Sequence, residues 1–145
     1  MRRAVARAYK SSERSEHTMY LVTGGAGFIG SNLVAALAAR GEVVVNDILD
    51  DSNRANLAKR GDLTVICPDE LPGWLASGGT NPEAIFHMGA ISSTVERDVD
   101  RIMQNNYLLS LRLWHWAAEH RVPFIYASSA ATYGGGELGF DDDNS

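Results

Sequence analysis

The stretch that decides the fold is Thr23-Gly24-Gly25-Ala26-Gly27-Phe28-Ile29-Gly30. Gly25, Gly27 and Gly30 satisfy the pattern G-x-G-x-x-G, and Gly24 precedes them. A strand is expected at 19–23, before the stretch, and a helix at 28–39, after it. In that setting the glycines allow a tight turn, and the start of the helix offers free N–H groups to a phosphate. A glycine turn without a ligand is the alternative, but the strand and helix on either side favour a dinucleotide-binding loop.

Short apolar runs continue to alternate with helical patterns along the rest of the chain. Further strands are expected at 42–47, 63–67, 84–88 and 123–127, and a long helix at about 101–119. The run Val43-Val44-Val45 is typical of a strand that is covered on both faces. Strands that alternate with helices indicate right-handed crossovers. The sequence therefore predicts an α/β fold with a doubly wound, Rossmann-like parallel sheet.

The expected helices carry their apolar residues at helical spacing. Ile29, Leu33 and Leu37 are predicted to form the inner face of the first helix. In the long helix the corresponding residues are Leu109, Leu113 and Trp116. The stretch 68–82 holds three glycines and three prolines, so we expect it to be the loosest connection.

Length and composition limit the class of protein. The 145 residues allow one compact unit, and 45% hydrophobic and 21% charged residues are typical of a folded domain. Cys67 is the single cysteine, so no internal disulfide can form, and we expect a reducing compartment, the cytoplasm. No apolar run approaches 18 residues, so we expect no membrane span and no membrane partner.

Charge is distributed unevenly. The net charge is −5, yet residues 1–18 contain five bases and only two acids. We expect 1–18 to be a basic arm that is disordered or a start-site artefact, with a short docked helix as the alternative. The dinucleotide-binding domain would then span 19–145. Its acidic balance argues against nucleic acid as a partner.

Asp47 supports the binding of a dinucleotide. It ends the second expected strand, 22 residues after Gly25, where an acid can hydrogen-bond the adenosine ribose. A carboxylate at that position favours NAD over NADP. Arg54 and Lys59 follow and could meet a 2′-phosphate, or they could be solvated helix charges. The residues by themselves leave the choice between NAD and NADP open.

Beyond this physical interpretation, the glycine stretch resembles the extended short-chain dehydrogenase/reductase family of nucleotide-sugar epimerases and dehydratases. Residues 83–94 and 123–135, together with Asn105-Asn106-Tyr107, are similar to the ADP-glyceromanno-heptose 6-epimerases. The similarity runs from about Met19 to Gly135. It implies an enzyme that inverts C6 of ADP-heptose for lipopolysaccharide core synthesis, by transient oxidation with NADP.

The resemblance also implies roles for individual residues. Phe28 and Ile29 would lie over the pyrophosphate, and Asn46 and Asp47 would bind the adenosine ribose. Asn105 would support the cofactor pocket from the long helix, and Ser129 would hydrogen-bond the reacting hydroxyl of the substrate. The wall of the cofactor site beyond the fourth strand would be formed by Met88, Gly89, Ala90, Ile91 and Ser92. Two residues depart from the family pattern: Met88 replaces a glutamate, and Asn53 replaces a lysine.

One part of the family's catalytic chemistry is not found in these 145 residues. The superfamily uses a tyrosine with a lysine four residues later, and the only lysines are Lys10 and Lys59, neither at that spacing. We therefore expect a cofactor-binding part, truncated before the substrate domain and inactive alone. Another sugar-nucleotide epimerase or dehydratase and a non-enzymatic NAD(P)-binding regulatory module remain as alternatives, and self-association is left open.

Several of these residues also have plain structural explanations. Ser128 and Ser129 could cap a turn, and Asn105 and Asn106 could be exposed on the helix. His87 is expected to be packed or hydrogen-bonded rather than catalytic. The acidic run 141–143 is expected to lie at the surface, with no metal site.

Overall fold

The computed structural model describes residues 18–58, 60–61, 63–77, 81–93, 95–137 and 139–140. Its centre is a five-stranded parallel sheet in the order β3-β2-β1-β4-β5. The strands are β1 (Met19–Thr23), β2 (Glu42–Asn46), β3 (Thr64–Ile66), β4 (Ala84–His87) and β5 (Phe124–Tyr126). All five predicted strands are confirmed. The predicted basic arm and the acidic run 141–143 lie outside the described residues, except for Thr18.

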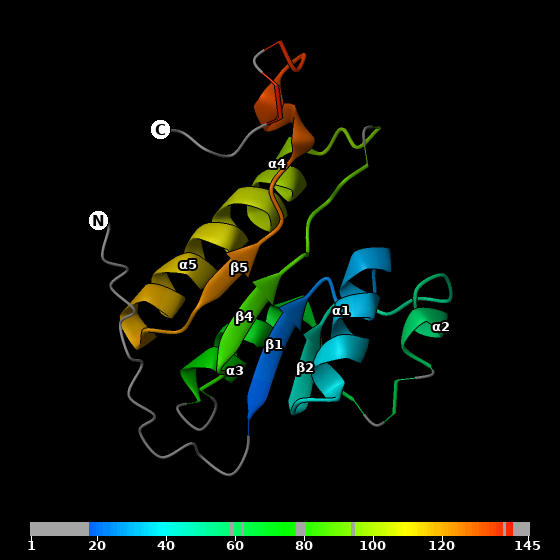
Figure 1. The fold of residues 1–145 in the computed structure, drawn as a ribbon, viewed down its shortest axis with the longest axis vertical. Helices are drawn as coiled ribbons and strands as arrows, with labels where there is room; N and C mark the ends of the chain where they lie inside the picture. The colour runs from blue at the N-terminus through cyan, green and yellow to red at the C-terminus, as the bar shows by residue number, and fades with distance from the viewer. Residues whose placement is uncertain are drawn as a thin grey trace, which may run out of the picture.

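Helices lie on both faces of the sheet (Figure 1). One face carries α1 (Phe28–Ala38) and α2 (Arg54–Leu57). The other carries α3 (Leu71–Ala76) and α5 (Leu109–His120). This arrangement confirms the doubly wound sheet.

Two apolar clusters fill the space between the sheet and its helices. The alternation of side chains along β2 divides its valines between them: Val44 faces α3 and α5, while Val43 and Val45 face α1 and α2. All three are buried, as the unbroken apolar run predicts. The sheet is therefore held from both sides at β1 and β2, immediately behind the glycine stretch.

The predicted inner face of α1 is partly wrong. Leu37 is buried and Leu33 half-buried, but Ile29 is 66% exposed, and Gly30 and Val34 take the inner positions instead. The first turn of α1 approaches the glycine stretch so closely that only a glycine fits on its inner side. Ile29 is therefore turned outward.

The predicted long helix is confirmed but is not uniform. It runs from α4 (Val99–Ile102) through a π-helical segment (Met103–Leu108) into α5. Leu113 is buried, with Leu109 and Trp116 packed against the same cluster, as the spacing predicts. The π-helical turn was not predicted, and such turns are frequent at functional sites.

Residues 68–76 of the stretch 68–82 form helical turns, which corrects the prediction of a loose connection for that part; residues 78–80 lie outside the described residues. A 3₁₀ turn at Pro68–Glu70 leads directly into α3, and Leu71 is buried in the core. Proline is compatible with the first turn of a helix, because the N–H it lacks there would have no helical partner.

Candidate functional site: the glycine loop and the β4 loop

The glycine loop passes against a second loop at the carboxyl end of the sheet. Gly24 has a φ of 65°, and a Cβ on it would lie 2.6 Å from the Cα of Gly89. A Cβ on Gly30 would lie 2.1 Å from the carbonyl oxygen of Gly24. The two positions have room only for glycine. The sequence pattern therefore reflects two close backbone approaches, one to the β4 loop (residues 88–92) and one to α1.

The start of α1 is suited to an anion. Its N-cap is Gly27, which has no side chain to satisfy the first amides, and the first turn carries no acidic residue. The free N–H groups and the helix dipole make such an end attractive to phosphate. Phe28 and Ile29 are 84% and 66% exposed at this end, although both are apolar.

Asp47 follows β2 and faces the glycine loop. Its Oδ2 accepts a hydrogen bond from the backbone N–H of Ala26 at 2.8 Å, and its Oδ1 accepts one from the N–H of Ile48 at 2.8 Å. Asn56 donates its Nδ2 to the carbonyl oxygen of Ala26 at 2.8 Å. The Ala26 peptide is therefore held at both its N–H and its carbonyl. A carboxylate accepts up to about four hydrogen bonds, so Asp47 keeps capacity for a hydroxyl group.

Asn46 lies in a different position from its neighbour. It is 2% exposed, and its Nδ2 donates to the carbonyl oxygen of Ile66 at 3.1 Å. Its amide thus ties β2 to β3. The predicted contact of Asn46 with a ribose stays a prediction.

The β4 loop is attached to β1 and to the π-helical segment. Met88 donates its N–H to the carbonyl oxygen of Thr23 at 3.1 Å. The side-chain amide of Asn106 holds the Ile91 peptide at both ends, with Oδ1 accepting from its N–H at 2.7 Å and Nδ2 donating to its carbonyl at 2.9 Å. Between these attachments, Ala90 is exposed and Gly89 half-buried, and Ser92 is exposed just after them.

His87 lies beneath this loop and is 5% exposed. Its Nδ1 lies 2.6 Å from Oγ1 of Thr23, and its Nε2 lies 2.7 Å from Oγ of Ser110. Burial lowers the pKa of His87 below its ordinary value, so the neutral ring is favoured. The prediction that this histidine is hydrogen-bonded is confirmed.

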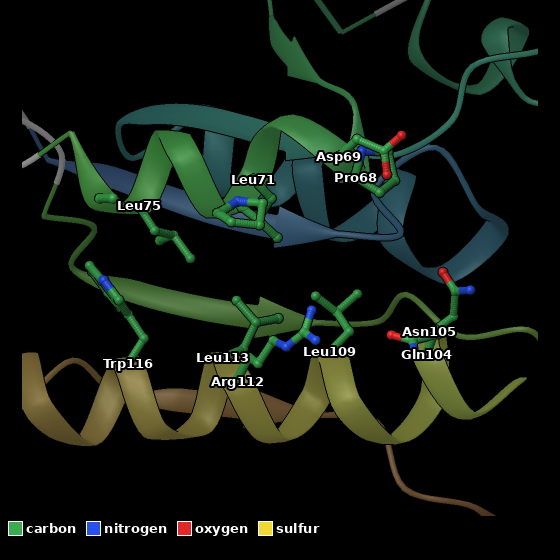
Figure 2. A pocket seen from close by; sticks show the side chains of 12 residues that line it. Pro68, Asp69, Leu71, Leu75, Gln104, Asn105, Leu109, Arg112, Leu113 and Trp116 are labelled. Carbon is green, nitrogen blue, oxygen red and sulfur yellow. The ribbon is translucent and has the colours of Figure 1, made fainter. Parts of the chain in front are cut away.

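Asn105 borders a groove of about 580 Å³ between α3 and α5 (Figure 2). It is half-buried, and its Nδ2 donates to the carbonyl oxygen of Arg101 at 2.8 Å. Across the groove are Pro68 and Asp69, which follow β3 by two and three residues. Asn105 therefore occupies the end of the groove that lies toward the carboxyl edge of the sheet.

Ser129 lies between β5 and the 3₁₀ turn that follows it. It is exposed, and its Oγ accepts a hydrogen bond from the N–H of Ala131 at 3.2 Å, so it caps the 3₁₀ turn Ala130–Tyr133. Ser128 lies beside it, with its Oγ 3.4 Å from Oγ1 of Thr132. The structural explanation of Ser129 as a turn cap is confirmed, and its catalytic role stays a prediction.

Residues 20–145 match the sequence model of the NAD dependent epimerase/dehydratase family. The chain belongs to this family. Over 130 residues it is 44% identical to an ADP-L-glycero-D-manno-heptose-6-epimerase of Fusobacterium nucleatum, covering 86% of this chain and 39% of that protein. The chain thus spans about two-fifths of the length of this curated relative.

Solved structures of the family agree with the fold. The Helicobacter pylori ADP-L-glycero-D-manno-heptose-6-epimerase superposes with a TM-score of 0.69 at 31% identity, over 82% of this chain and 41% of that one. A UDP-glucuronic acid 4-epimerase of Bacillus cereus in complex with NAD gives a TM-score of 0.67 at 26% identity, over 81% of this chain and 42% of that one. NAD dependence is thus a property of the family to which this chain belongs.

Sequence reasoning missed several residues that build these loops: Thr23, Asn56, Asn106 and Ser110. Thr23 opens the glycine stretch and Asn106 stands in the stretch 105–107, but neither pattern indicates what these side chains hold, and Asn56 and Ser110 stand in no motif. In the part of the chain that the structure describes, no three or more His, Cys, Asp or Glu side chains form a metal site. Within the same residues, no helix is long and apolar enough to cross a membrane.

Proposed function

We propose that this chain is the cofactor-binding part of an ADP-heptose 6-epimerase and that it binds NADP. The observation that carries the proposal is the junction of the glycine loop, the free start of α1 and Asp47. The 44% identity to a heptose epimerase supports the choice of substrate within the family.

The pyrophosphate would lie at the first amides of α1, with Phe28 and Ile29 as its apolar cover. Asp47 would accept a hydrogen bond from the adenosine ribose, with Asn46 beside it at the end of β2. The β4 loop would form the wall on the other side of the dinucleotide, and Asn105 would border the end of the groove nearest to it. These placements follow the positions of the residues at the carboxyl edge of the sheet, where open α/β sheets bind their ligands.

The choice of NADP depends on the loop after Asp47. Asn53, which replaces the lysine of related enzymes, is used inside this loop: its Nδ2 donates to the carbonyl oxygen of Ile48 and its Oδ1 accepts from the N–H of Asp50. Arg54 follows it as an exposed base at the start of α2. Arg54 would therefore take over the contact with a 2′-phosphate.

The chemistry would divide between the dinucleotide and the protein. A bound nicotinamide supplies the hydride acceptor that such an epimerase requires. Ser129 would orient the substrate hydroxyl, because its Oγ accepts from Ala131 and its own proton can be donated outward. The 145 residues contain no Tyr-x-x-x-Lys pair, so we expect negligible turnover of ADP-heptose by this chain alone.

Calorimetric titration of the purified chain with NADP⁺ and NAD⁺ tests the proposal. We expect saturable binding of one dinucleotide per chain, with NADP⁺ the tighter. The variant Asp47→Ala should weaken both, because it removes the acceptor that also holds the Ala26 amide. The variant Asp100→Ala, an exposed acid in α4, is the matched control and should bind as the wild type does. If neither dinucleotide binds, the proposal is contradicted. If NAD⁺ binds more tightly than NADP⁺, the proposed preference for NADP is contradicted.

Self-association belongs to the same proposal. Met103, Tyr107 and Trp114 are exposed large apolar residues along the π-helical segment and α5. Light scattering coupled to size exclusion should give a dimer or larger species. A monomer at high micromolar concentration would contradict this part.

A further inference from the structure

A chain of hydrogen bonds runs beneath the β4 loop, from β1 to the π-helical segment. The N–H of Gly89 donates to Oγ1 of Thr23 at 3.2 Å, and Thr23 Oγ1 lies 2.6 Å from Nδ1 of His87. On the other side of the ring, Nε2 lies 2.7 Å from Oγ of Ser110, which donates to the carbonyl oxygen of Asn106 at 2.8 Å. We call these five residues the relay.

The relay has one consistent arrangement of protons. Ser110 has a single hydroxyl proton and gives it to the Asn106 carbonyl, so its oxygen must accept from His87. The proton of the neutral imidazole is therefore on Nε2, and Nδ1 accepts the hydroxyl proton of Thr23. Thr23 Oγ1 in turn accepts the Gly89 amide. The other tautomer would require a second proton on Ser110 and would leave the buried Thr23 hydroxyl without this acceptor.

Because the relay is buried, its proton arrangement is restricted. Thr23 is 1% exposed and His87 is 5% exposed, and the ring of His87 stacks on Phe124 with centroids 5.8 Å apart. A buried polar group that loses its partner is costly, so the ring has little freedom to change tautomer. Each end of the relay is attached to the β4 loop: Gly89 is its first member, and the side chain of Asn106 holds the Ile91 peptide.

We propose that His87 is a positioning residue, held as the Nε2–H tautomer, which fixes the β4 loop against the glycine loop before a dinucleotide binds. This inference rests on the proposed function, because the β4 loop is the proposed wall of the cofactor site. Gly24 and Gly89 are in direct backbone contact, so a displacement of the β4 loop displaces the glycine loop as well. His87 itself does not have to touch the cofactor.

Nitrogen-15 NMR of the full chain without dinucleotide tests the tautomer directly. We expect the His87 ring to show one neutral species with the proton on Nε2. In the variant Ser110→Ala, the amides of Gly89 and Ile91 should exchange with solvent roughly tenfold faster. The matched control is Ser77→Ala, because Ser77 also donates to a carbonyl of its own helix, that of Trp74, but lies outside the relay. A proton on Nδ1, a mixture of tautomers, or unchanged exchange in Ser110→Ala would overturn the proposal.

Dinucleotide affinity then measures the consequence for binding. We expect Ser110→Ala and Thr23→Val to weaken NADP⁺ by roughly fivefold, and Thr23→Ser, which keeps the hydroxyl, to restore it. If Thr23→Val fails to fold, Ser110→Ala and Thr23→Ser still decide the question. If the wild-type chain shows the Nε2–H tautomer but binds no dinucleotide, the proposed function is contradicted and the proton arrangement of the relay is not. If the Ser110→Ala variant binds NADP⁺ as tightly as the wild type does, the positioning role of His87 is contradicted and the proposed function is not.

Discussion

Gly30 is the position at which a single methyl group should do most damage to both the fold and the site. A Cβ there would lie 2.1 Å from the carbonyl oxygen of Gly24 and 2.8 Å from the Cα of Gly25, whereas ordinary contact begins at 3.4 Å. The clashing atoms belong to the backbone, so no side-chain rotation relieves the contact. The variant Gly30→Ala must therefore move α1 away from the glycine loop by roughly 1 Å.

That movement has a calculable cost. α1 packs on the sheet through Val34 and Leu37, both of which are buried in the cluster that faces β2. Overpacking of this kind costs about 1–3 kcal/mol, and alanine recovers up to about 1 kcal/mol through its better helix propensity. We expect a net loss of about 1–2 kcal/mol in the free energy of unfolding. With a urea m-value of about 1–2 kcal/mol/M, the midpoint should fall by about 0.5–2 M.

Urea denaturation followed by circular dichroism measures this loss, and titration with NADP⁺ measures the accompanying loss of binding. The matched control is Gly73→Ala in α3, where nothing lies within 4 Å of the added Cβ. That control should leave the midpoint unchanged or raise it. The reasoning would be refuted by a Gly30→Ala variant that kept the wild-type midpoint, or by a Gly73→Ala variant that lost as much stability as Gly30→Ala.

Three further predictions concern single side chains. Because burial lowers the pKa of His87, the unfolded chain takes up a proton more readily than the folded one, so stability should fall as the pH drops below about 6.5. His87 can change the free energy of unfolding by at most about 1.4 kcal/mol per pH unit. Urea midpoints at pH 7.5 and 5.5 measure this pH dependence, which should be smaller in the variant His87→Gln. Arg54→Ala should raise the Kd for NADP⁺ by roughly fivefold at low salt and leave NAD⁺ within twofold; equal losses for both would contradict the assigned phosphate contact. Asn106→Ala should speed amide exchange at Ile91 while the midpoint falls by less than 1 M, which separates loss of the loop contact from general unfolding.

The sequence predicted the sheet well because the physical signal for it is local. Each strand is a short apolar run, and the valines of β2 show by themselves that both faces are covered. The glycine loop was equally accessible, because its positions reflect backbone approaches within a few residues of one another. The exception is Gly24, whose closest neighbour, Gly89, is 65 residues away in the chain.

The contacts that hold the β4 loop were inaccessible for the opposite reason. His87 pairs with Thr23 and Ser110 across sequence separations of 64 and 23 residues, and no periodicity connects them. The helical pattern allows Asn106 to be an exposed helix residue, yet its amide holds Ile91 from a π-helical turn. Propensities do not predict such a turn, because it adds one residue to a helix whose pattern otherwise continues.

The one failure of the apolar pattern in α1 also has a functional explanation. Ile29 is predicted to point into the core, but Gly30 must occupy the inner position because only a glycine can lie against Gly24. Phe28 and Ile29 are therefore forced outward at the start of α1, where they leave two apolar side chains in water beside free amides. Exposure of this kind is a local cost, and such costs concentrate where a protein binds its ligand. The same close packing that shapes the glycine loop thus also presents the apolar surface that a dinucleotide would cover under the proposed function.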